Sequence, residues 1–232
     1  DLLIDLGLVF HIALLLLLGT GAVACKNEAQ NRVSPDEARE AATASETSTV
    51  YEVDPEASTI NWRGTKPGGE HVGYINIQSG TFTAVDNDIE SGNIVIDMNS
   101  LTVTDEGISE ESKNRLENHL KGTVEGKETD FFNVPKYPTA AFEITGVNKQ
   151  NGQPQLQGNL TIKEDTKNIE FPVNIQINED ELYITSDTVT LDRTDWNVNY
   201  GSQSVFDNLG NNFISDAMEL RIEVKAHRTA QE

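Results

Sequence analysis

Cysteine and histidine are scarce in this sequence, and their scarcity excludes several kinds of functional site. The single cysteine, Cys25, cannot form an internal disulfide, and the four histidines form no cluster along the chain. Because a protein zinc site usually needs about four ligands, we predict no metal site. The chain also lacks a glycine-rich phosphate loop, a paired-cysteine redox motif and the common hydrolase signatures. We therefore expect no cofactor and no catalytic centre of these kinds.

Basic residues are also few. The chain has 17 Lys and Arg against 38 Asp and Glu, a formal net charge of -21. Of these charged residues, only Asp1 and Asp5 precede Cys25. The chain after Cys25 therefore has 17 basic and 36 acidic residues and a net charge of -19. Such a charge repels nucleic acid and anionic lipid headgroups, so neither is an expected electrostatic partner. Solubility through self-repulsion accounts for the charge without a specific function.

One long apolar run lies near the start, at residues 6–18. It is too short to span a bilayer comfortably and is typical of a signal-peptide core. Small residues follow, and then Cys25. This order resembles a bacterial lipobox, whose cysteine is lipidated, although Ala22 replaces the usual leucine and no basic segment precedes the run. We predict a lipoprotein signal peptide at 1–24 and a lipidated Cys25 on the outer membrane of the cell envelope. A plain cleaved signal and a retained anchor are the alternatives.

Residues 25–49 are rich in Glu, Ala, Ser and Thr and contain no aromatic residue. Their composition predicts too little apolar burial to offset the loss of chain entropy on folding. We therefore predict a flexible tether here, followed by a folded domain at 50–228.

From Val50 onward, apolar and polar residues alternate, which is typical of half-buried antiparallel strands. The pattern predicts about eight strands and one helix, at residues 110–120. Leu182 and Leu191 lie in opposite phase, so a bulge at residues 186–188 would bring both to the same face. Eight antiparallel strands closed into a barrel leave room for one small ligand. An open sandwich would show the same alternation.

Several ordered motifs resemble the YceI family of bacterial envelope proteins. The most distinctive covers residues 116–147, LENHLKGTVEGKETDFFNVPKYPTAAFEITGV, and others lie at 51–60, 68–73, 96–101, 158–163 and 191–201. The resemblance implies an all-β fold, an extended lipocalin-like barrel of eight antiparallel strands with one short helical excursion. It also implies non-catalytic binding of a long-chain amphiphilic lipid: a polyisoprenoid, an isoprenoid quinone, or a fatty acid or amide.

The site candidates follow from the alternation and from the resemblance. The aromatic and aliphatic residues expected to face the interior and contact ligand are Ile60, Trp62, Ile94, Ile96, Met98, Phe131, Phe132, Phe142, Ile144, Leu160, Ile162, Phe171, Val173, Ile175, Leu220 and Ile222. Polar candidates for the cavity mouth are His71, His119, Arg193 and Trp196, each of which could instead hold the barrel together.

Two other functions remain open from the sequence. One is an enzyme that uses scattered acidic residues and His119. The other is an interaction protein whose barrel is filled solid with side chains. The sequence indicates no oligomeric state.

Overall fold

The computed structural model describes residues 31–229. The predicted signal peptide, Cys25 and residues 26–30 of the predicted tether lie outside the described residues. Within 31–229, no helix has the length and apolar character needed to cross a membrane.

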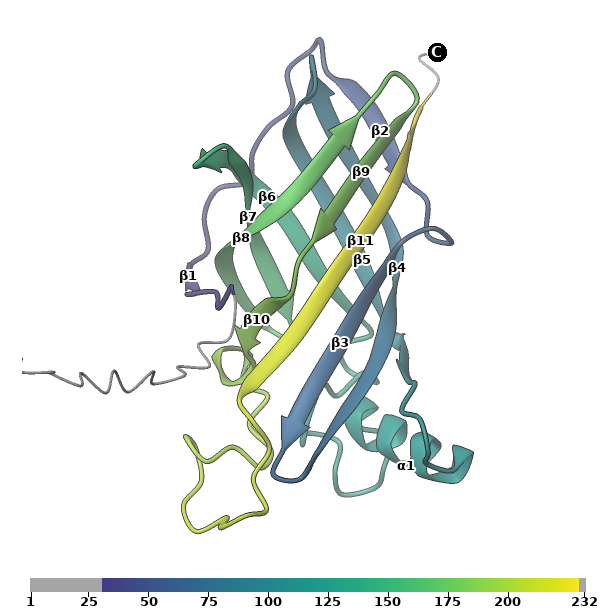
Figure 1. Cartoon of the computed structure of the whole chain (residues 1–232), viewed down its shortest axis with the longest axis vertical. Helices are drawn as coiled ribbons and strands as arrows, with labels where there is room; N and C mark the ends of the chain where they lie inside the picture. Colours follow the sequence, from purple (N-terminus) through teal and green to yellow (C-terminus); the bar gives the residue numbers. More distant parts are fainter. Residues whose placement is uncertain (1–30, 230–232) are drawn as a thin grey trace, which may run out of the picture.

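The chain folds as a closed antiparallel ring of strands with one α-helix at one end (Figure 1). The elements are β1 (Asp36–Glu37), β2 (Thr49–Val53), β3 (Thr59–Lys66), β4 (Gly69–Val85), β5 (Asp88–Val103), α1 (Glu110–Lys121), β6 (Thr139–Gln150), β7 (Gln153–Ile162), β8 (Asp165–Ile177), β9 (Glu181–Ser186), β10 (Val189–Asp192), the 3-10 helix η1 (Arg193–Trp196) and β11 (Ala217–Arg228).

The ring has eight strand positions, because the two-residue β1 only pairs with β8, and two pairs among the other ten strands each share one position. Both β2 and β3 pair with β4 on one side and with β11 on the other. In the same way, β9 and β10 follow one another along β11. Consecutive strands from β4 to β9 pair in sequence order, and the first and last positions close the ring. The predicted eight-stranded antiparallel barrel with one helical excursion is confirmed.

The bulge predicted at residues 186–188 is the break between β9 and β10. Thr185 pairs with Glu223 and Val189 with Leu220, so three residues on one strand face two on the other. The Ser186 hydroxyl accepts a hydrogen bond from the Ile222 backbone N–H at 3.0 Å, which satisfies the donor that the bulge leaves unpaired. The bulge brings the apolar residues of both strands to the interior.

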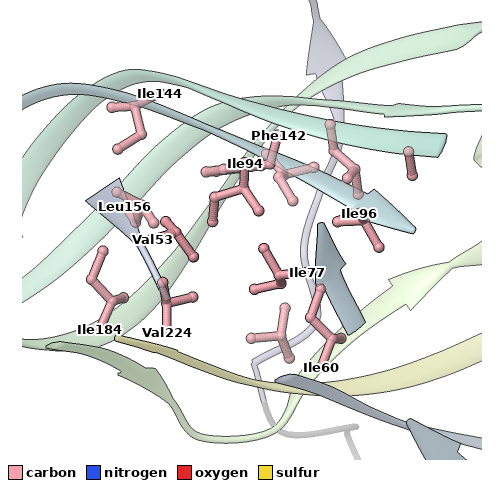
Figure 2. Close-up of a cluster of buried hydrophobic side chains, with 14 of the residues drawn as sticks. Val53, Ile60, Ile77, Ile94, Ile96, Phe142, Ile144, Leu156, Ile184 and Val224 are labelled. Carbon is pink, nitrogen blue, oxygen red and sulfur yellow. The ribbon is translucent and has the colours of Figure 1, made fainter. Parts of the chain in front are cut away.

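The apolar faces of the ring strands project into one shared interior. Figure 2 shows the side chains of Ile94, Phe142 and Leu156, from three strands, converging there. Glycine makes room for the largest of them. A Cβ at Gly158 would lie 2.2 Å from Phe142 Cζ, and one at Gly73 would lie 2.7 Å from the Trp62 ring. These two aromatic side chains can lie across the interior only because their neighbours lack side chains.

Helix α1 forms as predicted and packs beside the end of the barrel. Ser109 caps its N-terminus by accepting a hydrogen bond from the Ser112 N–H, and Gly122 ends it with φ of 74°. Glu117 fastens the helix to β5 by accepting a hydrogen bond from the Val103 N–H at 2.8 Å. A Cβ at Gly122 would lie 2.4 Å from the Glu128 carbonyl oxygen, so glycine is required there.

The prediction of a flexible tether is wrong for residues 31–48, which we call the strap. The strap packs against the barrel: its β1 pairs with β8, and Val33 is only 5% exposed. The backbone of Arg39 exchanges two hydrogen bonds with the side chain of Asn159, at 3.0 and 2.7 Å. The Ala42 N–H donates to the Ile144 carbonyl. The sequence argument considered only apolar burial, whereas polar side chains on the barrel hold the strap's backbone.

The strap also crosses a gap in the sheet. β5 and β6 pair only from Asn93 to Asp97, less than half of either strand. Beyond that stretch, Ala42 reaches β6 and the Ser45 N–H and hydroxyl both donate to Glu90 on β5. The strap therefore connects two strands where their own ladder stops.

Candidate functional site

The end of the barrel beside α1 holds an apolar cavity of about 120 Å³, which we call the mouth cavity. Side chains from the strands form its walls. Over it lie the side chains of Leu120, Phe131 and Phe132. Leu120 belongs to α1, and the two phenylalanines belong to residues 122–138, between α1 and β6, which we call the roof. Residues 197–216, which we call the rim loop, add Val198 and Ile214. The full lining is Ile60, Trp62, Ile75, Ile96, Met98, Leu101, Leu120, Phe131, Phe132, Ala140, Leu160, Ile162, Arg193, Val198, Ile214, Ser215, Met218 and Leu220.

A second cavity of about 60 Å³, the inner cavity, lies deeper in the barrel. It is lined by Ile60, Ile94, Ile96, Phe142, Leu156, Leu160, Ile169, Phe171, Ile184, Val189, Leu191, Leu220, Ile222 and Val224. All of these side chains are apolar. Because Ile60, Ile96, Leu160 and Leu220 line both cavities, the two adjoin along the barrel axis. The interior therefore presents a continuous apolar lining from the roof inward.

The size of these cavities limits what fits without movement. Ligand pockets typically enclose roughly 300–1,000 Å³, and a dry cavity of about 150 Å³ is enough for benzene. At about 120 and 60 Å³, the mouth and inner cavities hold only a short apolar group as they stand. A long chain would have to push apart the side chains between them, or the roof above.

His119 supports the roof and does not line either cavity. Its Nε2 lies 2.7 Å from Asp130 Oδ2. Its ring meets the edges of Phe131 and Tyr200, with centroids 5.1 and 5.0 Å away. The imidazole thus joins α1, the roof and the rim loop, which is the structural role left open by the sequence.

Arg193 fastens the rim loop from beneath. Its guanidinium donates to the carbonyl oxygens of Ser215, Val198 and Ile214 at 3.0, 2.5 and 3.0 Å. Burial lowers the pKa of Arg193, and the charge of Asp216, whose carboxylate lies 3.6 Å away, opposes that shift. Arg193 is 5% exposed and also lines the mouth cavity, so it places a buried positive charge at the end of an apolar lining.

Trp196 and His71 hold the barrel rather than line its cavities. Trp196 is fully buried, and its indole N–H donates to the Leu160 carbonyl at 3.0 Å. His71 Nδ1 lies 2.5 Å from one oxygen of Asp105, whose other oxygen accepts from the Val72 N–H. Among residues 31–229, no three His, Cys, Asp or Glu side chains are grouped so that they could hold a metal.

Nearly all of the predicted apolar site residues line one of the two cavities; the exceptions are Ile144, Val173 and Ile175. Ile144 and Val173 face the interior, as their phase predicts, but pack where no space remains. Ile175 lies beside Val147 in a polar surface depression. Ligand contact by the remaining residues stays a prediction.

Of the lining that comes from outside the strands, the sequence argument included Phe131 and Phe132, but it missed Leu120 and the residues of the rim loop. Val198 and Ile214 lie in the irregular rim loop, where no period marks an inward residue. Leu120 lies in the predicted helix, but it was not among the site candidates. The alternation of apolar residues identifies strand residues that form the walls of the cavity. It does not identify the residues of irregular segments that lie over the cavity.

The chain resembles known proteins in family and in fold. Residues 51–226 match the family described as the YceI-like domain. No curated protein matched. The chain is similar to BcnA of Burkholderia cenocepacia, with 18% identity and a TM-score of 0.54 over 75% of this chain and 98% of that one. It is also similar to a polyisoprenoid binding domain from Saccharophagus degradans, with 14% identity and a TM-score of 0.51 over 78% and 99% of the two chains.

Proposed function

Since the chain belongs to the family of YceI-like domains, we propose that its barrel binds a long-chain amphiphilic lipid without making or breaking a bond. The observation that carries the proposal is the pair of adjoining apolar cavities behind the roof. A polyisoprenoid, an isoprenoid quinone, and a fatty acid or amide all have the chemistry for such a lining. The similar polyisoprenoid binding domain supports this class of ligand.

Burial of the chain supplies the driving force. Each methylene removed from water contributes about 0.8 kcal/mol, so a chain of about twenty contributes at most about 16 kcal/mol. Loss of translational freedom and the displacement of side chains offset much of that gain. Because the cavities are small as they stand, the affinity depends on how easily the roof and the side chains around Ile96 and Leu160 move.

The polar end of the ligand would lie near the mouth. Arg193 and Ser215 are the cavity-lining residues with a charged or hydroxyl group, and both belong to the mouth cavity. Arg193 already donates to three carbonyl oxygens, so it would act on a head group mainly through its charge. This arrangement favours an oxygen-rich or anionic head group over a cationic one.

We also propose that the protein is an envelope lipoprotein anchored through Cys25. The apolar run at residues 6–18 and the small residues before Cys25 support this. In cells, Cys25→Ser should release the protein from the membrane fraction. Protein that stays membrane-bound after a carbonate wash would contradict the anchor.

The two alternatives are less well supported. Neither cavity lining contains an Asp, Glu, His or Cys side chain, so the described interior offers no general acid or base to an enzyme. A barrel filled solid would leave no adjoining cavities. Lipid binding accounts for both the apolar lining and the unfilled space.

Native mass spectrometry tests the proposal. Protein purified without detergent from a bacterial host should carry a noncovalent adduct with the mass of a lipid, released when the protein is denatured. A single peak at the protein's own mass, together with an organic extract free of lipid, would overturn it.

A further inference from the structure

The rim loop presents an unusual surface. Four large apolar side chains are exposed among the described residues, and three of them, Tyr200, Val205 and Phe206, lie in this loop, with 40%, 46% and 48% exposure. Val205 and Phe206 follow one another in the chain, and we call this exposed pair the knob. Isolated exposed apolar residues are common, so exposure alone decides nothing. The position of the knob is what matters.

The knob lies on a loop whose structure is held by several contacts. The Ile214 N–H donates to the Gly201 carbonyl at 2.8 Å, and the Ser204 hydroxyl donates to Asp216 at 2.6 Å. Arg193 binds the returning chain at Ile214 and Ser215 from below. The loop therefore holds Val205 and Phe206 outward on a fixed support.

The same loop borders the mouth cavity. Its Val198 and Ile214 line the cavity, and its Tyr200 ring lies 5.2 Å from the ring of Phe131 in the roof. In Figure 1 the loop projects beyond the strands at the end of the barrel that carries α1. The loop that carries the knob therefore also forms part of the lining of the mouth cavity.

The path of the N-terminal segment points to the same end. The Val33 N–H donates to the Thr190 carbonyl, and Arg32 pairs with Asp192 at 3.0 Å, directly before η1 and the rim loop. Cys25 lies seven residues before Arg32 in sequence, so the intervening chain spans at most about 25 Å. A lipid on Cys25 would keep this end of the barrel close to the membrane.

We propose that the rim loop docks the mouth of the barrel on a lipid surface through Val205 and Phe206. The contact is apolar, since residues 197–216 include no Lys or Arg and two Asp, Asp207 and Asp216. The knob enters the boundary between headgroups and acyl chains, and the mouth cavity then faces the membrane. This goes beyond the proposed lipid binding and does not depend on it, because docking needs no molecule in the cavity.

A position-specific fluorescent label tests the docking. In the full chain with Cys25→Ser, Asp207→Cys places an environment-sensitive label next to the knob, and Asn151→Cys places one in the β6–β7 turn as a control. The probe surface is vesicles of phosphatidylcholine, with and without bromine on the acyl chains. The label at 207 should shift to the blue and be quenched by brominated lipid, whereas the label at 151 should do neither. The apolar run at residues 6–18 is present in every variant, so only differences between label positions count.

A matched variant isolates the knob. Val205→Ser with Phe206→Ser, in the chain labelled at 207, should abolish the quenching while the circular dichroism of the β-sheet is unchanged. Adding phosphatidylglycerol should weaken the signal, because the protein is acidic. Equal quenching at 207 and 151, quenching that survives the two serines, or quenching that rises with phosphatidylglycerol would each overturn the proposal. A label protected only at high protein concentration would assign the surface to self-association instead.

Discussion

At the scale of single residues, polar side chains near the mouth mostly hold backbone in place. Arg193 binds three carbonyl oxygens of the rim loop, Trp196 binds the Leu160 carbonyl, and His119 pairs with Asp130. Arg193 and Trp196 lie in one of the motifs that resemble the family, at residues 191–201, but the motif does not show which groups these side chains bind. Three of these four carbonyl groups lie 21 to 36 residues away along the chain, and no local pattern encodes such contacts.

Arg193→Lys should destabilise the fold although it keeps the charge. A lysine side chain is shorter and ends in a single ammonium group. It cannot reach all three carbonyl oxygens that the forked guanidinium of arginine binds. The loss of at least two buried hydrogen bonds should lower the free energy of unfolding by about 2–4 kcal/mol. Urea denaturation measures this. A change under about 0.5 kcal/mol would show that the rim loop does not depend on Arg193.

Asp195 should make the stability of the folded protein depend on pH, and the direction of its pKa shift determines the sign. Burial raises the pKa of Asp195 above its ordinary value of 3.8, and the neighbouring charge of Asp192 raises it further. The folded state then holds the proton more tightly than the unfolded state. Stability is therefore lost as the pH rises from 3.8 through the raised value, and the loss remains at neutral pH.

Asp195→Asn should remove that loss. The melting temperature should rise at neutral pH and stay the same well below pH 3.8, where the carboxyl is protonated in both states. Melting curves at the two pH values measure the difference. An equal rise at both would mean that the charge is not the cause.

At the scale of elements, the strands and α1 could be predicted, and the strap could not. Alternation marks the strands because half of each faces the core, and the opposite phases of Leu182 and Leu191 even located the bulge. The strap has almost no apolar pattern of its own. It is held by polar residues of the barrel: Asn159 binds the backbone of Arg39, and Asn168 donates a hydrogen bond to Asn159 and pairs with Asp36 of the strap.

Removing the strap should destabilise the barrel, contrary to what the composition of these residues suggests. A chain beginning at Val50 loses Val33, the clamp between Arg39 and Asn159, and the link across β5 and β6. Asn159→Ala in the full chain should cost about 1–3 kcal/mol. In the shortened chain, where Asn159 would meet water, the same substitution should cost little.

The difference between those two costs measures the coupling of the strap to Asn159, with other effects cancelled. Equal costs in both chains, measured by urea denaturation, would show that the strap is not bound through this side chain. A shortened chain that melts at the temperature of the full chain would restore the prediction of a loose tether.

At the scale of the whole molecule, closure into a ring creates the site. The number of strand positions could be predicted from the alternation and the closure from the family resemblance. The amount of space inside could not, because it depends on how side chains such as Phe142 over Gly158 fill a closed volume. The cavities adjoin at Ile60, Ile96, Leu160 and Leu220, so this is where a change in volume should matter most.

Filling that junction should shorten the longest chain that binds. Ile96→Phe adds volume where the two cavities meet, whereas Val173→Ile adds volume in the core away from both. In a series of saturated fatty acids, Ile96→Phe should weaken binding of the longest members by about 10-fold or more, corresponding to about 1.4 kcal/mol. Val173→Ile should leave the length profile unchanged, although overpacking can lower stability. Identical profiles for the two variants would show that the junction does not limit the length of the fatty acid that binds.

The central claim is that an acyl or isoprenoid chain lies inside the barrel, and bromine quenching of tryptophan tests it most directly. The protein has two tryptophans: Trp62 lines the mouth cavity and Trp196 does not line either cavity. A fatty acid with bromine on its chain should quench the fluorescence strongly, the unbrominated acid should not, and Trp62→Phe should remove most of the quenching. If the brominated chain binds without quenching, or if quenching is unchanged in Trp62→Phe, the chain does not lie in this cavity.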